Sequence, residues 1–297
     1  MKTLLYATDC TQTTRTALKY AYRLSKVLKA NLHVVHVYDL QAFATTSVRS
    51  RAVLEKNYSL DQYKVLESYC KENLENEFGA KKVYFHVERD ESISKAILAT
   101  AQRINADLVM VGVKNSKTLR GFFSGNIADY LMKNLECPLL ILPDEFHYHG
   151  LSTLLYATDF ETSDIYAIEN LVELAEPYGA LIKVMHVHRE REYDADEKME
   201  AFKKSVTERV AYPEIIFSVE WADDVESGIH NSIEEEMPEI LVMMEREHPS
   251  FFAKLFRKDM VETMENEIAI PLLVFNKKSV QGKLIEASDD ALFLQWI

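Results

Sequence analysis

A six-residue run that occurs twice limits what this chain can fold into. The sequence Leu-Leu-Tyr-Ala-Thr-Asp begins at Leu4 and again at Leu154, an offset of 150 residues (154 − 4). Later, the dipeptide Val-Glu at residues 87–88 recurs at 219–220, an offset of 132 (219 − 87). The chain therefore holds two copies of a unit of roughly 130 to 150 residues, which predicts two domains of one fold. The first copy carries 18 additional residues (150 − 132) between these matches.

Each copy alternates short apolar runs with longer amphipathic runs. In the first copy, strands are expected at about residues 3–8, 31–37, 82–87, 108–111 and 139–142. Between these strands, helices are expected at about 13–28, from Ser59 to before Gly79, after Asp90 and from Gly125. Such an alternation, with continuously apolar strands, is typical of a parallel, doubly wound α/β sheet.

Polar side chains predict where two of these helices begin. Ser59 and Gln62 have the spacing of a capping box and are expected to open the second helix. Asp90 is expected to cap the third helix. The additional segment before Ser59, residues 39–58, is polar with scattered apolar residues and is expected to form a loop or a short helix.

The composition argues against several classes of protein. With 34 Lys and Arg against 47 Asp and Glu, the net charge is −13, which is unfavourable for binding nucleic-acid phosphates. No apolar run reaches the roughly 18 residues of a membrane span, so we expect a cytoplasmic protein without a membrane partner. Three scattered cysteines, Cys10, Cys70 and Cys137, are expected to be reduced thiols.

The stretch at residues 106–143 predicts a strand, a loop, a helix and a second strand. Gly112 is expected to end the first strand, and Gly125 with Asn126 to open the helix. Unpaired backbone N–H groups and the helix dipole make such a helix start an anion site, most often for phosphate. Neither the Walker pattern nor the dinucleotide glycine pattern is present. Alternatively, these glycines serve only tight turns and helix packing.

The spacing Gly112-x2-Asn115-x9-Gly125-Asn126 resembles the G-x2-G-x9-G-(S/T) motif of the universal stress protein family. Asn replaces the second glycine and the final Ser or Thr. Asn tolerates a left-handed backbone better than most residues, and the Asn126 amide can still hydrogen-bond a phosphate. The resemblance covers about residues 2–276, so it includes both copies.

The resemblance implies a fold and a domain organisation. Each copy is expected to form a five-stranded parallel sheet with the strand order 3-2-1-4-5, and the fifth strands are expected to meet in a pseudo-dimeric arrangement. The expected domains are residues 1–146 and 147–279, followed by a C-terminal extension, 280–297. The apolar residues of this extension are expected to dock on the chain itself or on a partner.

The resemblance also implies a nucleotide site, because some members of the family bind ATP. The Asp after the first strand contacts the adenine end, a residue at the end of the second strand lines the site, and the glycine loop holds the phosphates. The matching residues are Ala7, Thr8, Asp9, Val37, Val111, Gly112, Asn115, Gly125, Asn126 and Ile127. The resemblance leaves open a Mg²⁺ ion bound with the nucleotide. Alternatively, Asp9 is only a helix N-cap or a loop residue.

The second copy departs from this motif at its glycines. Met244 stands at the position of Gly112, and Lys258 and Asp259 stand at the positions of the final Gly-Asn pair. Glu245 and Glu247 enter the loop, and carboxylates repel phosphates. We therefore expect an adenine nucleotide in the first domain only.

Metal binding and catalysis have little support in the sequence. His186 and His188 share one strand face, and His147 and His149 lie in the linker, but no carboxylate or cysteine has a matching spacing. No metal site is expected, and no catalytic residue can be assigned. At most, weak ATP hydrolysis is expected.

The leading functional hypothesis is adenine-nucleotide sensing by the first domain. The degenerate second domain would serve structure or partner binding. The alternative is a stress-response interaction protein that binds no nucleotide, and an ATP-using enzyme is least favoured. The sequence leaves open an unidentified protein partner and a homodimer.

Overall fold

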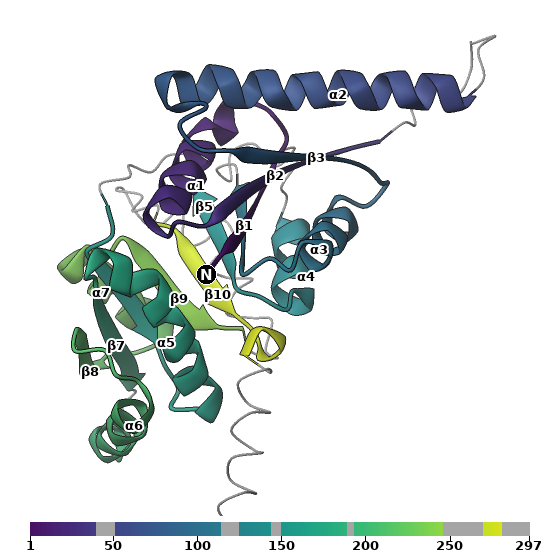
Figure 1. The fold of residues 1–297 in the computed structure, drawn as a ribbon. Helices are drawn as coiled ribbons and strands as arrows, with labels where there is room; N and C mark the ends of the chain where they lie inside the picture. The colour runs from purple at the N-terminus through teal and green to yellow at the C-terminus, as the bar shows by residue number, and fades with distance from the viewer. Residues whose placement is uncertain (40–50, 114–124, 144–149, 189–192, 246–269, 281–297) are drawn as a thin grey trace, which may run out of the picture. The chain divides into compact units, whose positions relative to one another are not determined.

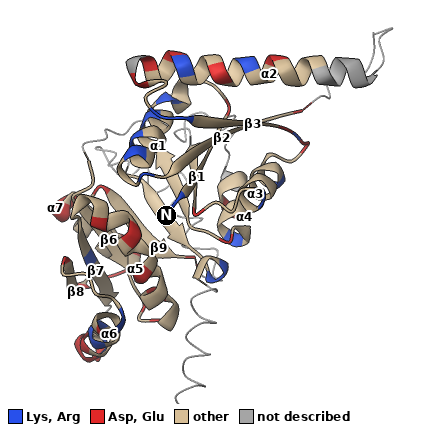
Figure 2. Cartoon of the chain, viewed as in Figure 1, with Lys and Arg blue, Asp and Glu red and all other residues tan. Residues whose placement is uncertain are grey.

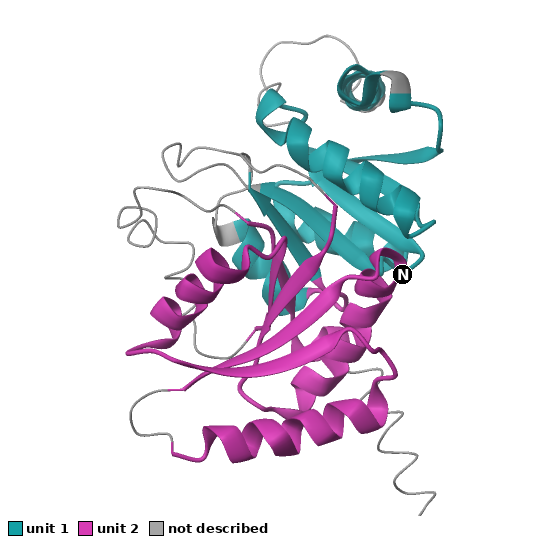
Figure 3. Ribbon diagram, turned by 90° about the vertical axis from the view of Figure 1, so that its left-hand side faces the viewer, with its two compact units in different colours: residues 1–134, 139–147 teal, residues 135–138, 148–297 magenta. Residues whose placement is uncertain are grey.

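The computed structural model describes residues 1–39, 51–113, 125–143, 150–188, 193–245 and 270–280. The chain forms two compact units (Figure 3). Unit 1 comprises residues 1–134 and 139–147, and unit 2 comprises residues 135–138 and 148–297. Each unit alternates strands and helices, as the sequence predicts.

Unit 1 is built on a parallel sheet with the strand order β3-β2-β1-β4-β5 (Figure 1). The strands are β1 (Thr3–Thr8), β2 (Asn31–Tyr38), β3 (Val83–Arg89), β4 (Leu108–Val113) and β5 (Leu139–Pro143). The helices are α1 (Arg15–Val27), α2 (Arg51–Leu74), α3 (Ile93–Arg103) and α4 (Gly125–Asn134). Helix α1 packs against α2 and α3 against α4, and the two pairs cover opposite faces of the sheet. The predicted doubly wound fold and strand order are confirmed.

Unit 2 has the equivalent strand order, β8-β7-β6-β9-β10. Its strands are β6 (Thr153–Ala157), β7 (Leu181–His188), β8 (Ile215–Trp221), β9 (Ile240–Met244) and β10 (Leu272–Phe275). Its helices are α5 (Thr162–Ala175), α6 (Ala195–Arg209) and α7 (Val225–Glu236). The pseudo-dimeric pairing of the two sheets stays a prediction. Most of the C-terminal extension, residues 281–297, lies outside the described residues.

The central strands are buried because helices cover both faces of each sheet. Leu4, Leu5 and Tyr6 of β1 are fully buried. The apolar face predicted for α1 is also buried, which the spacing of Ala17 and Leu24 already indicates. Among the described residues, the helices are too short or insufficiently apolar to cross a membrane. Acidic and basic side chains are mixed along α2 (Figure 2).

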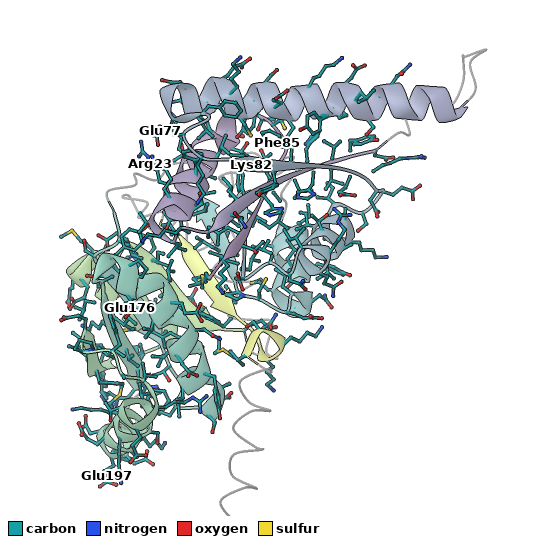
Figure 4. All side chains as sticks on the ribbon, viewed as in Figure 1. Arg23, Glu77, Lys82, Phe85, Glu176 and Glu197 are labelled. Atoms are coloured by element: carbon teal, nitrogen blue, oxygen red, sulfur yellow. The ribbon has the colours of Figure 1, made fainter. Side chains whose placement is uncertain are left out.

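Helix α2 is anchored to α1 at its carboxyl end. There the chain turns through Glu75–Glu77, and Tyr22 Oη donates to the Glu77 carbonyl oxygen at 2.5 Å. Arg23 Nη2 lies 3.5 Å from Glu77 Oε1 (Figure 4). Near the middle of the helix, the Tyr63 ring meets Phe85 of β3 edge-on, with ring centroids 5.8 Å apart. These contacts hold α2 over one face of unit 1.

Two predicted helix starts are wrong. Helix α2 begins at Arg51, so Ser59 and Gln62 lie inside it rather than at a capping box. Residues 51–58 contain no glycine or proline that would stop a helix, and Tyr58 gains an edge contact with Tyr38. Part of the predicted loop at 39–58 is therefore helical, while residues 40–50 lie outside the described residues.

The start of α3 also differs from the prediction. Its N-cap is Ser92, and Asp90 Oδ1 accepts a hydrogen bond from the Ser92 N–H at 2.7 Å. Asp90 therefore turns the chain just before the helix, as Asp side chains commonly do, without capping it.

The repeat extends to unusual backbone conformations. Three pairs of left-handed residues are equivalent, with offsets of 150 or 132: Cys10 (φ 58°) and Phe160 (φ 64°), Lys29 (φ 53°) and Gly179 (φ 63°), Asn105 (φ 49°) and Met237 (φ 45°). The residue types differ within each pair. The fold therefore imposes these turns even where the side chain disfavours them.

Gly228 lets α7 approach β7 closely. A Cβ at this position would lie 2.5 and 2.8 Å from the two methyl groups of Val187. Helix propensity alone favours Gly228→Ala by about 1 kcal/mol, but overpacking costs about 1–3 kcal/mol. We expect a net loss of stability in urea unfolding. In a Val187→Ala background the same substitution should stabilise the protein, and a loss of equal size in both backgrounds would contradict the packing argument.

Met237 is a long, exposed side chain in a left-handed conformation, where Asn is better tolerated. We expect Met237→Asn to raise the free energy of unfolding by roughly 0.5–1 kcal/mol. The matched substitution Asn105→Met, at the equivalent position of unit 1, should lower it. Urea denaturation of both variants tests this, and a shift of the same sign in both would contradict it.

Candidate functional site

Most of the described residues of the predicted nucleotide site lie at the carboxyl end of the unit 1 sheet. Ala7 of β1 pairs with Val111 of β4, and Thr8 pairs with His36 of β2. Val37 is buried one residue further along β2. The adjacency of β1 and β4, which was implied only by the family resemblance, thus brings Ala7, Thr8 and Val111 together. In open α/β sheets, ligands bind at this edge, where the strand order reverses.

Asp9 organises the loop that follows β1. Its Oδ1 accepts hydrogen bonds from the Thr11 N–H at 3.0 Å and from Thr11 Oγ1 at 2.7 Å. Thr8 Oγ1 accepts from the Cys10 N–H at 3.0 Å, and Cys10 adopts a left-handed conformation. Asp9 is not the N-cap of α1, which is Thr14. It is a loop residue whose carboxylate shapes the turn, and its contact with a nucleotide stays a prediction.

A buried hydroxyl network supports this loop from below. Tyr6 Oη donates to the Thr14 carbonyl oxygen at 2.9 Å. Thr14 Oγ1 lies 3.1 Å from Thr8 Oγ1 and 2.8 Å from Tyr69 Oη, which comes from α2. Burial is the main cause that raises the pKa of Tyr69 to about 12, so this phenol stays protonated at neutral pH. Thr14 and Tyr69 could not be predicted as part of the site, since nothing in their spacing connects α2 with the loop.

Cys10 is a poor nucleophile in this position. Burial, and secondarily the Asp9 carboxylate, raise the pKa of its thiol to about 12. The thiolate, which is the reactive form, is therefore scarce at neutral pH. Cys10, Cys70 and Cys137 form no disulfide bond.

Gly112 has a packing role. The prediction that β4 ends at Gly112 is wrong. The strand continues to Val113, and Gly112 pairs with Leu142 of β5. A Cβ at Gly112 would lie 3.3 Å from the Ala17 Cβ, so the glycine lets α1 approach β4. The predicted alternative role in helix packing is therefore supported for Gly112.

Helix α4 begins at Gly125, as predicted, so Asn126 and Ile127 lie in its first turn. The first turn of a helix offers unpaired N–H groups and partial positive charge. Residues 114–124, including Asn115, lie outside the described residues.

Unit 2 fills the equivalent region with its own side chains. Asp164, at the position of Thr14, is fully buried. Its carboxylate accepts hydrogen bonds from Tyr156 Oη at 3.0 Å, Thr158 Oγ1 at 2.7 Å and the Asp159 N–H at 3.2 Å. The Glu161 N–H also donates to it, at 3.3 Å. A buried negative charge thus occupies the loop donors of unit 2.

Aromatic side chains also distinguish unit 2. Phe160, at the position of Cys10, packs on His186 with ring centroids 4.2 Å apart and on Phe202 at 5.7 Å. Met244, at the position of Gly112, is buried. The carboxyl end of the unit 2 sheet therefore differs from that of unit 1 in its acidic and its bulky side chains.

A second group of titratable side chains lies on β2 and β3. His33 Nδ1 is 2.8 Å from His86 Nε2, and Tyr84 stacks on His33 with centroids 4.7 Å apart. Burial, and then the neighbouring His86, lower the pKa of His33 to about 4. Burial and Arg103 lower the pKa of His86, against an opposing effect of Glu88, which is paired with Arg103. The pair is therefore neutral at pH 7.

His186 and His188 belong to no metal-binding group in the part of the chain that the structure describes. Among the described residues, no group of three His, Cys, Asp or Glu side chains is placed to hold a metal ion. His186 Nδ1 donates to the Thr158 carbonyl oxygen at 2.8 Å, so this ring has a structural role. His188 follows on the same face of β7, while His147 and His149 lie outside the described residues.

The His33–His86 pair predicts a pH dependence of stability. Because the folded pKa of His33 lies below the unfolded value of about 6.5, the unfolded chain binds more protons between pH 6.5 and 4. The contribution of the neutral His33 ring to the free energy of unfolding is therefore complete above pH 6.5 and is lost as the pH falls toward 4. Solvent screening moderates the effect, since both rings are half-exposed. Urea midpoints at pH 7, 5.5 and 4.5 should fall less steeply for His33→Asn than for the wild type, and equal slopes would contradict this.

Comparison with known proteins shows what the first half of the chain is similar to. Residues 1–143 match the model of the Universal stress protein family. A universal stress protein of Methanocaldococcus jannaschii is 24% identical over 143 residues, which cover 48% of this chain and 81% of the relative. A putative universal stress protein of Staphylococcus aureus is 26% identical over 144 residues, 48% of this chain and 85% of the relative.

The fold of the whole chain also has a solved counterpart. The crystal structure of a universal stress protein from Archaeoglobus fulgidus matches with a TM-score of 0.63 and 16% identity. The match covers 93% of this chain and 98% of that one. At this identity the match shows the fold alone, and it extends the likeness over both units.

Proposed function

We propose that unit 1, whose residues 1–143 match the universal stress protein family, binds an adenine nucleotide. The family resemblance of the sequence supports ATP as the ligand. In this proposal, the base lies near Asp9 and Val37, and the phosphates lie at the start of α4. Mg²⁺ would accompany the phosphates.

The observation that carries this proposal is the convergence of β1 and β4 at one edge of the sheet. Ala7 and Val111 are paired, so the Asp9 loop and the chain leaving β4 start from neighbouring positions. The helix that follows β4 begins with Gly125, and its unpaired N–H groups suit an anion. A polar loop and a helix start that follow neighbouring strands support the proposal, because a nucleotide combines a polar base with charged phosphates.

We further propose that unit 2 binds no nucleotide and serves structure or partner binding. Asp164 occupies the loop N–H donors, and its buried charge would repel a phosphate. Phe160 and Phe202 take up volume beside His186. The protein would therefore bind one nucleotide per chain, in unit 1 only.

The second candidate is an interaction protein that binds no nucleotide. Large apolar side chains are exposed on unit 2, among them Tyr193 (93% exposed), Trp221 (61%) and Met237 (77%). Exposed aromatic residues are common in protein interfaces. This alternative predicts binding through unit 2 and no effect of nucleotides.

Nucleotide content is the direct test. Freshly purified protein is denatured, released nucleotides are identified by chromatography, and the nucleotide-free protein is titrated with ATP, ADP and AMP, with and without Mg²⁺. We expect about one nucleotide per chain. Two per chain would contradict the assignment of unit 2, and no binding at millimolar ligand would favour the interaction protein.

A charge-neutralising pair of variants tests the role of Asp9. Asp9→Asn keeps an oxygen that can accept from Thr11 but removes the carboxylate charge. We expect ATP affinity to fall roughly tenfold, the size of one charge-assisted hydrogen bond, with little change in stability. Asp159→Asn, the matched change in unit 2, should leave ATP affinity unchanged. Equal affinities of Asp9→Asn and the wild type in calorimetry would remove Asp9 from the site.

A further inference from the structure

We propose that His36 is a positioning residue for the nucleotide site: its ring holds the last carbonyl group of β1 and sets the turn that presents Asp9. The part of this inference that concerns affinity rests on the proposed function of unit 1. The part that concerns the turn stands on geometry alone, and the two can be tested separately.

The ring of His36 supplies an additional donor at the end of β1. His36 is buried, and its Nδ1 lies 3.0 Å from the carbonyl oxygen of Thr8. A carbonyl oxygen only accepts, so Nδ1 carries the hydrogen and donates it. Thr8 is the last residue of β1, it is buried, and it still pairs with His36 in the β1–β2 ladder. The ring therefore adds a side-chain donor to a carbonyl group with two acceptor sites, and this contact holds the point at which the main chain leaves the sheet toward Asp9.

The turn follows directly from this point. Two residues after the anchored carbonyl group, Cys10 adopts φ 58°, and its N–H donates to Thr8 Oγ1 at 3.0 Å. Asp9 lies between them, with Oδ1 bound to the Thr11 N–H. The direction of the Asp9 carboxylate therefore depends on where the Thr8 carbonyl group is held.

Unit 2 contains the same device around different residues. His186 Nδ1 lies 2.8 Å from the Thr158 carbonyl oxygen. Phe160 adopts φ 64°, and its N–H donates to Thr158 Oγ1 at 2.9 Å. The loop residues have changed, from Cys10 to Phe160 and from a hydroxyl to a buried carboxylate at Asp164. The histidine, the carbonyl contact and the left-handed turn are common to both units.

What holds the far side of the ring differs between the units. In unit 1, the side-chain amide of Gln62 on α2 lies 3.2 Å from His36 Nε2. Because Nδ1 carries the hydrogen, Nε2 of the neutral ring accepts, and the amide is assigned with its NH2 group facing the ring. In unit 2, Phe160 packs on the His186 ring instead. The ring of unit 1 is thus fixed by a polar contact and leaves Cys10, a small residue, beside the loop. Ligands require positioning groups to be held within about 0.5 Å, so a loosened ring should affect binding in unit 1 alone.

The experiment compares two polar substitutions of nearly equal size. His36→Asn retains an N–H donor close to the place of Nδ1, whereas His36→Gln moves its amide toward the place of Nε2. We expect His36→Gln to weaken ATP binding roughly tenfold in calorimetry, and His36→Asn to stay within about threefold of the wild type. His186→Gln is the matched control in unit 2 and should leave ATP affinity unchanged, even where its urea midpoint falls as much as that of His36→Gln.

Two outcomes overturn the positioning role. One is equal ATP affinity of His36→Gln and the wild type. The other is an equal loss of affinity in His36→Gln and His186→Gln, which would indicate a general effect of stability.

If the wild-type protein binds no ATP, the proposed function fails and the turn is tested alone. Amide hydrogen exchange at Cys10 and Thr11 should then be at least roughly tenfold faster in His36→Gln than in His36→Asn. Exchange at Phe160 and Glu161 should respond in the same way to His186→Gln and His186→Asn. Unchanged exchange at these amides would overturn the inference, whether or not a nucleotide binds.

Discussion

The register between the first and fourth strands is the constraint on which each unit depends. A carboxylate placed just before the fourth strand fixes it. In unit 1, Asp107 Oδ2 accepts from the backbone N–H groups of Lys2 and Thr3, at 2.6 and 2.7 Å. In unit 2, Glu239, which precedes β9, accepts in the same way from the backbone N–H groups of Ser152 and Thr153 at the start of β6. Since a one-residue slip would turn every side chain to the wrong face, this double contact keeps the carboxyl ends of the two strands level.

With that register fixed, the two units differ at this edge of the sheet in their loops and in what lies beneath them. At one position under the first loop, unit 1 has Thr14 and unit 2 has Asp164. The hydroxyl shares its hydrogen bonds with Tyr69 of α2, while the carboxylate takes the N–H groups of its own loop. The loop of unit 1 is thus hydrogen-bonded to a neighbouring helix, whereas the N–H groups of the unit 2 loop are hydrogen-bonded to Asp164. A single change of residue type accounts for much of the difference between the two sites.

The fold could be predicted from the sequence because its strongest signals are local. The repeated run that begins at Leu4 and Leu154, and the alternation of apolar and amphipathic runs, correctly indicate the sheet and most of its elements. The start of α2 could not be predicted, because the capping-box spacing at Ser59 occurs within a segment that has no helix breaker. Strand adjacency came from the family resemblance, since periodicity carries no information about which strands pair.

The candidate site was predictable only in part, for a physical reason. Asp9 and the start of α4 are visible in the sequence because they end a strand and begin a helix. His36, Thr14 and Tyr69 are not, because their contacts join residues that are far apart in the chain and have no characteristic spacing. Buried polar side chains of this kind look like ordinary members of an apolar strand or an amphipathic helix until the partner is known.

Helix α2 is where these long-range contacts meet. Gln62 reaches His36 and Tyr69 reaches Thr14, so both sides of the Asp9 loop receive a polar contact from one helix. The helix is itself fixed to α1 through Tyr22 and Glu77. Buried polar contacts constrain geometry more sharply than apolar ones, because a displaced partner leaves a donor or acceptor unsatisfied. Unit 1 therefore holds its loop through a separate helix, and a change in the loop's hydrogen bonds would be transmitted first to α2.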